Sequence, residues 1–71
     1  MRGVKNQNPE GLEKIRRSQK ISRTQLAEMS GISFYSIRDY ERGRRDIHLA
    51  NIQTLKALAS ALNVTIDELL D

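Results

Sequence analysis

Apolar residues recur at intervals of three and four positions through most of this chain, the spacing that gathers them on one face of an α-helix. The clearest stripe consists of Ile52, Leu55, Leu58, Ala59 and Leu62. No comparable stretch alternates apolar and polar residues as a β-strand does. The pattern therefore predicts an all-α protein with five short helices, at about residues 9–19, 23–30, 34–42, 52–62 and 66–70.

Capping residues punctuate these segments. Ser22 opens a Ser-x-x-Gln capping box and Thr65 opens a Thr-x-x-Glu box, in which each side chain bonds the other's backbone N–H. Gly31 and Gly43 follow the second and third segments, where a left-handed residue ends a helix. Asn8-Pro9 supplies a cap and a first-turn proline for the first helix.

The first eight residues show no helical period and are expected to form a flexible N-terminal arm, so residues 9–71 make up the predicted domain. A chain of 71 residues is close to the lower size limit for a self-sufficient core. The absence of cysteine excludes disulfides and fits a reducing cytoplasm. The sequence has no membrane-length apolar run and no signal-peptide core at its start. We therefore expect one cytoplasmic domain.

Charge is distributed unevenly along the chain. Residues 1–45 carry eleven of the twelve Lys and Arg residues against five acids, whereas residues 46–71 carry one Lys against four acids. The first part therefore has a balance of +6 and the second a balance of −3. A basic surface confined to one part of a small domain favours a polyanionic partner.

The second and third predicted helices are joined by a very short turn. Gly31 makes the turn, Ile32 can fill the junction, and Ser33 can cap the following helix. Ala27 is small where the two helices must approach each other closely. This order is typical of a helix-turn-helix motif.

The whole segment 12–70 resembles the lambda-repressor-like, Cro-type helix-turn-helix family. The resemblance is carried by LEKIRR, ISRTQLAEMSGIS, IRDYERGRR and TLKALASALNVTIDELL, in that order. It implies a compact five-helix lambda-repressor-like DNA-binding domain. It further implies sequence-specific binding to double-stranded DNA through the major groove, and transcriptional regulation, mostly repression, by dimers on palindromic operators.

The helical period divides the third helix into two faces. At about 100° per residue, Ile37, Tyr40 and Glu41 share the face expected in the core. Tyr35, Asp39 and Arg42 share the opposite face. Tyr35 is expected to point away from the core, so it does not contribute to core packing, which favours a binding surface.

The resemblance, together with this phase, predicts base readout by Phe34, Tyr35, Arg38 and Asp39. Phe34 can pack on a thymine methyl group, unless it borders the core beside Ile37. Arg38 can reach guanine, and Asp39 can accept from a cytosine amino group or orient Arg38 or Arg42.

Phosphate contacts are expected around the same helix and at the start of the second one, where backbone N–H groups and the helix dipole attract anions. The residues expected to make them are Arg23, Ser33, Ser36, Arg42, Arg44 and Arg45. The alternative for the last three is an ordinary solvated turn. The resemblance also implies a partly buried structural ion pair between Arg16 and Glu41.

Two further regions carry predictions. The dimer surface is expected at the C-terminal end, which lies outside the basic part: Leu62, Val64, Ile66, Leu69 and Leu70. The connection between Gly43 and Asn51 is about three residues longer than is common in the family. Its apolar residues Ile47, Leu49 and Ala50 either cover the core, which we favour, or form an exposed patch for a partner.

Other classes of function are less well supported by the sequence. One alternative is an antitoxin-like or other protein-interaction module with secondary DNA binding, and another is a helical RNA-binding or adaptor protein. His48 is the only histidine, and no nucleophile–base constellation or Gly-rich phosphate loop is present. We therefore expect no enzyme activity, no cofactor and no metal site.

Overall fold

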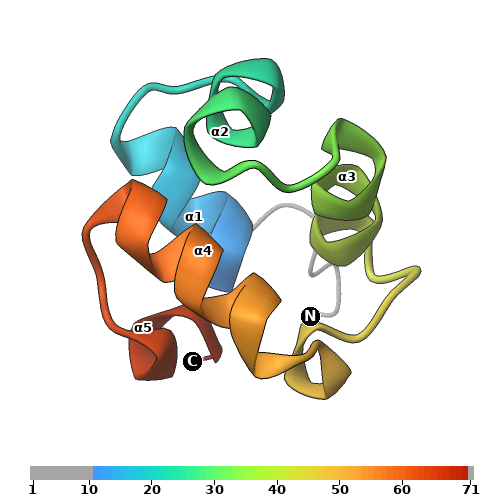
Figure 1. The fold of residues 1–71 in the computed structure, drawn as a ribbon. Coiled ribbons are helices and arrows are strands. Elements are labelled where there is room, and N and C mark those ends of the chain that lie inside the picture. The colour runs from blue at the N-terminus through green and yellow to red at the C-terminus, as the bar shows by residue number, and fades with distance from the viewer. Residues whose placement is uncertain (1–10, 71) are drawn as a thin grey trace, which may run out of the picture.

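Helices make up all the regular structure of residues 11–70, the part of the chain that this computed structural model describes (Figure 1). The elements are α1 (Gly11–Ser18), α2 (Arg23–Ser30), α3 (Phe34–Arg42), the 3-10 turn η2 (Ile47–Leu49), α4 (Ile52–Leu62) and α5 (Ile66–Leu70). The predicted all-α, five-helix fold class is confirmed. The expected arm at 1–8, the start of the first helix at Pro9 and the last residue lie outside the described residues.

Local hydrogen bonds set the ends of the helices in the motif. The Ser22 hydroxyl accepts from the Gln25 backbone N–H at 3.0 Å, and the Gln25 side-chain oxygen accepts from the Ser22 N–H at 2.8 Å. Gly31 and Gly43 end α2 and α3 with φ values of 76° and 79°. A Cβ atom at either glycine would meet open space, so glycine is favoured there by the backbone conformation and not by crowding.

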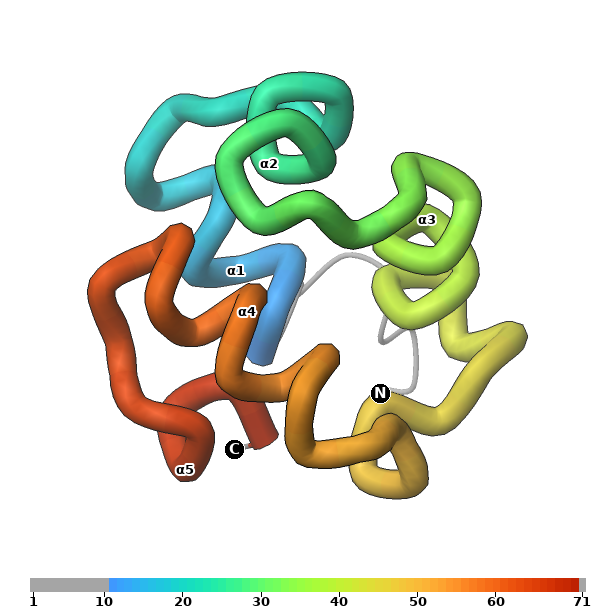
Figure 2. Tube along the Cα trace, viewed as in Figure 1, coloured from blue at the N-terminus to red at the C-terminus, as the bar shows by residue number. Residues whose placement is uncertain are grey.

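The core forms around α4, which crosses the middle of the molecule (Figures 1 and 2). Its Leu58 side chain is fully buried because α2 and α5 both pack against this helix. α1 packs on α3 and α5 and covers the remaining side. The buried cluster consists of Leu12, Leu26, Ile37, Leu58, Ala59, Leu62 and Leu69. None of the helices in residues 11–70 is long and apolar enough to cross a bilayer.

Two residues expected on a dimer surface lie in this core instead. Leu62 is 0% exposed and Leu69 is 1% exposed. α5 turns back against α1 and α4, so Leu69 faces inward and closes one end of the core. The prediction was wrong for these two residues, whereas Val64, Ile66 and Leu70 remain partly exposed.

The apolar residues of the long connection after α3 differ in their burial. Ile47 packs against the core, while Leu49 is 83% exposed and Ala50 is partly buried. The covering role therefore holds for Ile47, and Leu49 matches the alternative of an exposed residue. Because η2 is a single turn, its side chains point in different directions.

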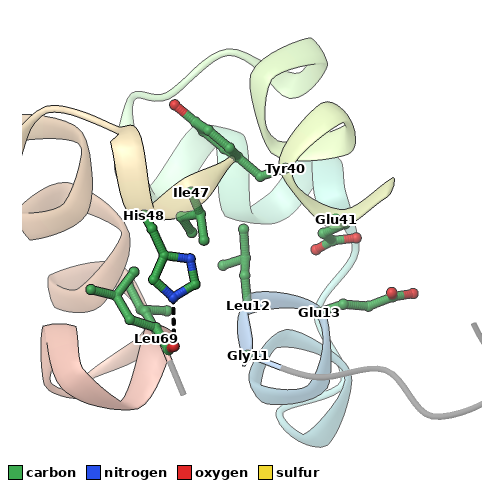
Figure 3. Close-up of a pocket in the computed structure, with 9 residues that line it drawn as sticks. Gly11, Leu12, Glu13, Tyr40, Glu41, Ile47, His48 and Leu69 are labelled. Atoms are coloured by element: carbon green, nitrogen blue, oxygen red, sulfur yellow. Dashed lines mark hydrogen bonds between the residues drawn. The ribbon is translucent and has the colours of Figure 1, made fainter. Parts of the chain in front are cut away.

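His48 ties this turn to the C-terminal helix (Figure 3). Its Nδ1 lies 3.1 Å from Asp46 Oδ1 and its Nε2 lies 3.0 Å from the Leu70 carbonyl oxygen. The same Asp46 oxygen accepts from the His48 backbone N–H at 2.9 Å and caps η2. The backbone hydrogen bond, followed by the one from the ring, lowers the pKa of Asp46.

The lowered pKa of Asp46 predicts a pH-dependent contribution to stability. A carboxyl group with a lower pKa in the folded state stabilises the fold above its unfolded pKa, and this contribution is lost as the pH falls through the folded value. Asp46→Ala should therefore lower the Tm at neutral pH, and the difference from the parent chain should shrink in acid. Thermal unfolding followed by circular dichroism across this range measures both. Asp46→Asn keeps the capping oxygen and should retain more stability than Asp46→Ala; a deficit unchanged by pH would contradict the account.

Candidate nucleic-acid interface

In the helix-turn-helix segment, one side of α3 packs against the core and the opposite side is exposed. Residues 31–33 connect α2 to α3, and the Ser33 hydroxyl caps α3 by accepting from the Tyr35 N–H at 3.1 Å. Ile32 packs against the core cluster and Ile37 is fully buried within it. Because these two residues hold the inner side of α3, the opposite side is turned to solvent, where Tyr35 is 65% exposed.

Four side chains on the outer side of α3 form one continuous cluster, called here the outer cluster: Phe34, Tyr35, Arg38 and Asp39. The two aromatic rings meet edge to face, with centroids 5.4 Å apart and an interplanar angle of 89°. The guanidinium carbon of Arg38 lies 5.2 Å from the Tyr35 ring centroid. Asp39 Oδ1 accepts from Arg38 Nε and Nη2, each at 3.3 Å. The structure thus brings together the side chains predicted to read bases, and Phe34 is partly buried beside Tyr35.

Arginines flank this cluster at the end of α3. Arg42 and Arg44 are exposed. Arg45 is held in place: its Nη1 donates to the Ser36 hydroxyl at 2.9 Å, and its guanidinium carbon lies 4.9 Å from the Tyr40 ring centroid. The Ser36 hydroxyl thus accepts from a neighbouring arginine and still has its own proton to donate. A row of positive charge therefore continues from α3 into the following turn.

A buried carboxylate joins the three helices behind this surface. Glu41 Oε2 and Oε1 accept from Arg16 Nε and Nη2 at 2.7 and 3.0 Å, and Arg16 Nη1 donates to the Ile21 carbonyl at 2.7 Å. The Glu41 side chain is 0% exposed. Its hydrogen bonds raise the pKa of Arg16, so the arginine stays charged. The Arg16–Glu41 pairing expected from the sequence is present.

Arg23 also bonds Glu41, a contact that was not predicted from the sequence. Its Nε donates to Glu41 Oε1 at 2.8 Å, and its side chain is 26% exposed. Arg23 was expected to face phosphate, but its Nε is directed inward in the structure. Two arginines against one glutamate still leave a net positive charge beside the start of α2. A positive charge and a helix N-terminus both attract an anion.

A small cavity of about 170 Å³ lies between α1, α3, η2 and α5, and none of the outer-cluster residues lines it (Figure 3). Leu12, Ile47 and Leu69 supply much of its wall. Three of the polar side chains on its border have partners: Glu13 lies beside Arg17, Glu41 bonds the arginines, and the ring nitrogens of His48 lie beside Asp46 and the Leu70 carbonyl. Among residues 11–70, no three His, Asp or Glu side chains gather as a metal site. The chemistry of this surface is therefore that of the outer cluster and its arginines.

Comparison with known proteins agrees with this geometry. A helix-turn-helix family model matches residues 12–69. Among solved structures, the N-terminal DNA-binding domain of SinR from Bacillus subtilis is similar, with a TM-score of 0.75 and 27% sequence identity, over 84% of each chain. No curated protein matches the chain.

Replacement of the buried carboxylate should destabilise the fold strongly. Glu41→Gln leaves Arg16 with an uncompensated buried charge and removes the charged partner of Arg23, so the free energy of unfolding should fall by about 3–5 kcal/mol. Urea unfolding measures the change. Glu13→Gln is the matched control, because Glu13 meets Arg17 at 3.6 Å on the surface and such a pair contributes about 1 kcal/mol or less. Equal losses in the two variants would refute the structural role of Glu41.

Proposed function

Since this chain belongs to the helix-turn-helix family of DNA-binding domains, we propose that it binds double-stranded DNA sequence-specifically, with α3 in the major groove, and regulates transcription. The observation that carries the proposal is the outer cluster: four side chains able to contact bases, on the solvent side of a helix whose other side is buried. An α-helix fits the major groove, where each base pair presents a distinct pattern of donors and acceptors. The similar domain of SinR is itself a DNA-binding domain, which supports the same role here.

The four residues of the outer cluster offer different chemistry to base edges. Phe34 lies in the first turn of α3, the part of a recognition helix that enters the groove first, and it can pack on a thymine methyl group. Tyr35 offers a hydroxyl beside an exposed ring. Arg38 donates and Asp39 accepts. Such groups distinguish one base pair from another, whereas phosphate contacts do not.

Phosphate binding is assigned to the groups that surround the outer cluster. Arg42 and Arg44 are exposed, and Arg45 is oriented by Ser36 and Tyr40. The Ser33 hydroxyl accepts from Tyr35 N–H and has a proton left to donate. The start of α2, with Arg23 beside it, forms the other phosphate site. These contacts supply most of the affinity and its dependence on salt.

We propose that the protein acts as a homodimer on a palindromic operator and represses transcription by occupying it. A single module of this size buries too little surface for tight operator binding, which a twofold assembly corrects. Figure 1 places α5 on the side of the molecule opposite α3. The partly exposed residues Val64, Ile66 and Leu70 therefore form the proposed dimer surface. Binding to the chromosome of a prokaryote or to viral DNA would place the protein in the cytoplasm.

Selection from a random pool of double-stranded DNA tests the proposal directly. The selected sites are expected to contain two inverted half-sites, and Tyr35→Ala should reduce the preference for them over scrambled DNA by about 1–3 kcal/mol. Tyr35→Phe separates the contribution of the hydroxyl from that of the ring. Absence of any selected sequence would refute sequence-specific binding. A single asymmetric site would refute the palindromic dimer.

Arg44→Ala tests the assignment of phosphate contacts. Loss of one phosphate contact should weaken binding to selected and scrambled DNA alike, and should reduce the slope of log K against log salt by about 1. Lys56→Ala, which removes the same charge from an exposed position of α4, is the control and should leave the slope nearly unchanged. A change in base preference with an unaltered salt slope would reverse the assignment of Arg44.

A further inference from the structure

Arg38 and Asp39 are bonded in a way that divides the guanidinium group into two edges. Asp39 Oδ1 accepts from Nε and Nη2, both at 3.3 Å, and so occupies the side edge of the planar group. The end edge, formed by Nη1 and the second hydrogen of Nη2, still presents two parallel donors. Within residues 11–70, no hydrogen bond uses Arg38 Nη1, and none uses Asp39 Oδ2.

Aromatic rings hold the same guanidinium in position. The Tyr35 ring centroid lies 5.2 Å from its carbon, within range of a cation–π attraction. Phe34 in turn braces Tyr35 edge to face at 5.4 Å. The side chains of Arg38 and Asp39 are 30% and 24% exposed, so both are accessible to a partner yet partly enclosed. A side chain already held in one orientation loses less conformational entropy on binding.

Building on the proposed function, we propose that Arg38 and Asp39 form one specificity-determining unit that reads guanine together with the amino group of a cytosine in the major groove. Guanine offers two acceptors, N7 and O6, to a pair of parallel donors, and cytosine offers its N4 amino group to a carboxylate. The end edge of Arg38 bonds the guanine, and Asp39 Oδ2 accepts from the cytosine. In this unit Asp39 is also the positioning residue for Arg38.

The charge of the pair separates this role from phosphate binding. Arg38 and Asp39 together are neutral, and a carboxylate is repelled by the phosphate backbone. The pair therefore adds little to the salt-dependent attraction on which affinity for any DNA depends. Arg44, which is exposed, differs from Arg38 in this respect. A loss of base preference without a loss of salt dependence is thus the signature of the unit.

The test compares DNA selected from a random pool by the full chain, by Arg38→Ala and by Asp39→Ala. The full chain should select a guanine and a cytosine at fixed positions of each half-site. Arg38→Ala should reduce the preference for that guanine roughly 10- to 100-fold. Because it leaves Asp39 unpaired, it should also weaken binding to scrambled DNA, but the salt slope should change less than in Arg44→Ala, since Arg38 is not assigned a phosphate contact. Asp39→Ala should weaken both the guanine and the cytosine preference, while binding to scrambled DNA becomes tighter because a negative charge is removed.

A matched control separates positioning from simple loss of charge. Asp67→Ala removes an exposed carboxylate from α5, on the opposite side of the molecule, and should leave the base preferences as they are. Circular dichroism and Tm verify that each variant is folded. The partial exposure of both Arg38 and Asp39 is compatible with their truncation in a folded chain.

Each result decides the inference. Selected sites that lack guanine, or a guanine preference that survives Arg38→Ala, would overturn the readout by Arg38. A preference profile unchanged by Asp39→Ala would overturn the unit and leave Arg38 acting alone. If the full chain selects no sequence, the proposed function itself fails, and this inference fails with it.

Discussion

The placement of α3 depends on one buried carboxylate. Glu41 lies on the inner side of that helix, fully shielded from solvent, and bonds Arg16 of α1 and Arg23 of α2. A buried charge is tolerated only when its partners are in place, so the three helices have to meet in the geometry that supplies both arginines. Ile37, one turn earlier, adds fully buried apolar contact. Together they determine which side of α3 faces solvent, and hence which side chains can meet DNA.

Two kinds of positive charge follow from this placement. The guanidinium of Arg38 is paired with Asp39 and stacked on Tyr35, whereas Arg44 is exposed on the turn that follows. A paired, oriented arginine is suited to recognising a base edge, and an exposed one to attracting phosphate. In the function proposed above, the same residue type therefore serves selectivity at one position and affinity at another, and the difference lies in the neighbours of each side chain.

The long connection after α3 adds Ile47 to the core and leaves Leu49 exposed. Ile47 covers apolar surface, and the two ring nitrogens of His48 lie within hydrogen-bond distance of Asp46 and the Leu70 carbonyl. The turn thereby links the end of the helix-turn-helix segment to α5. Because α5 is also held by the fully buried Leu69, this short helix belongs to the core, and only its partly exposed residues are available for a partner.

The sequence by itself determined the five-helix class and the helix-turn-helix segment, because both depend on local signals. Ser22 and Ser33 cap by bonding backbone groups two or three residues away, and Gly31 and Gly43 end helices through their own backbone conformation. The partners of Arg23 and the burial of Leu62 and Leu69 required the tertiary structure. A helical period shows which apolar or charged residues share one face of a helix. Only the packing of whole helices decides what that face contacts. The helical period likewise left open whether Asp39 orients Arg38 or Arg42, and the structure pairs it with Arg38.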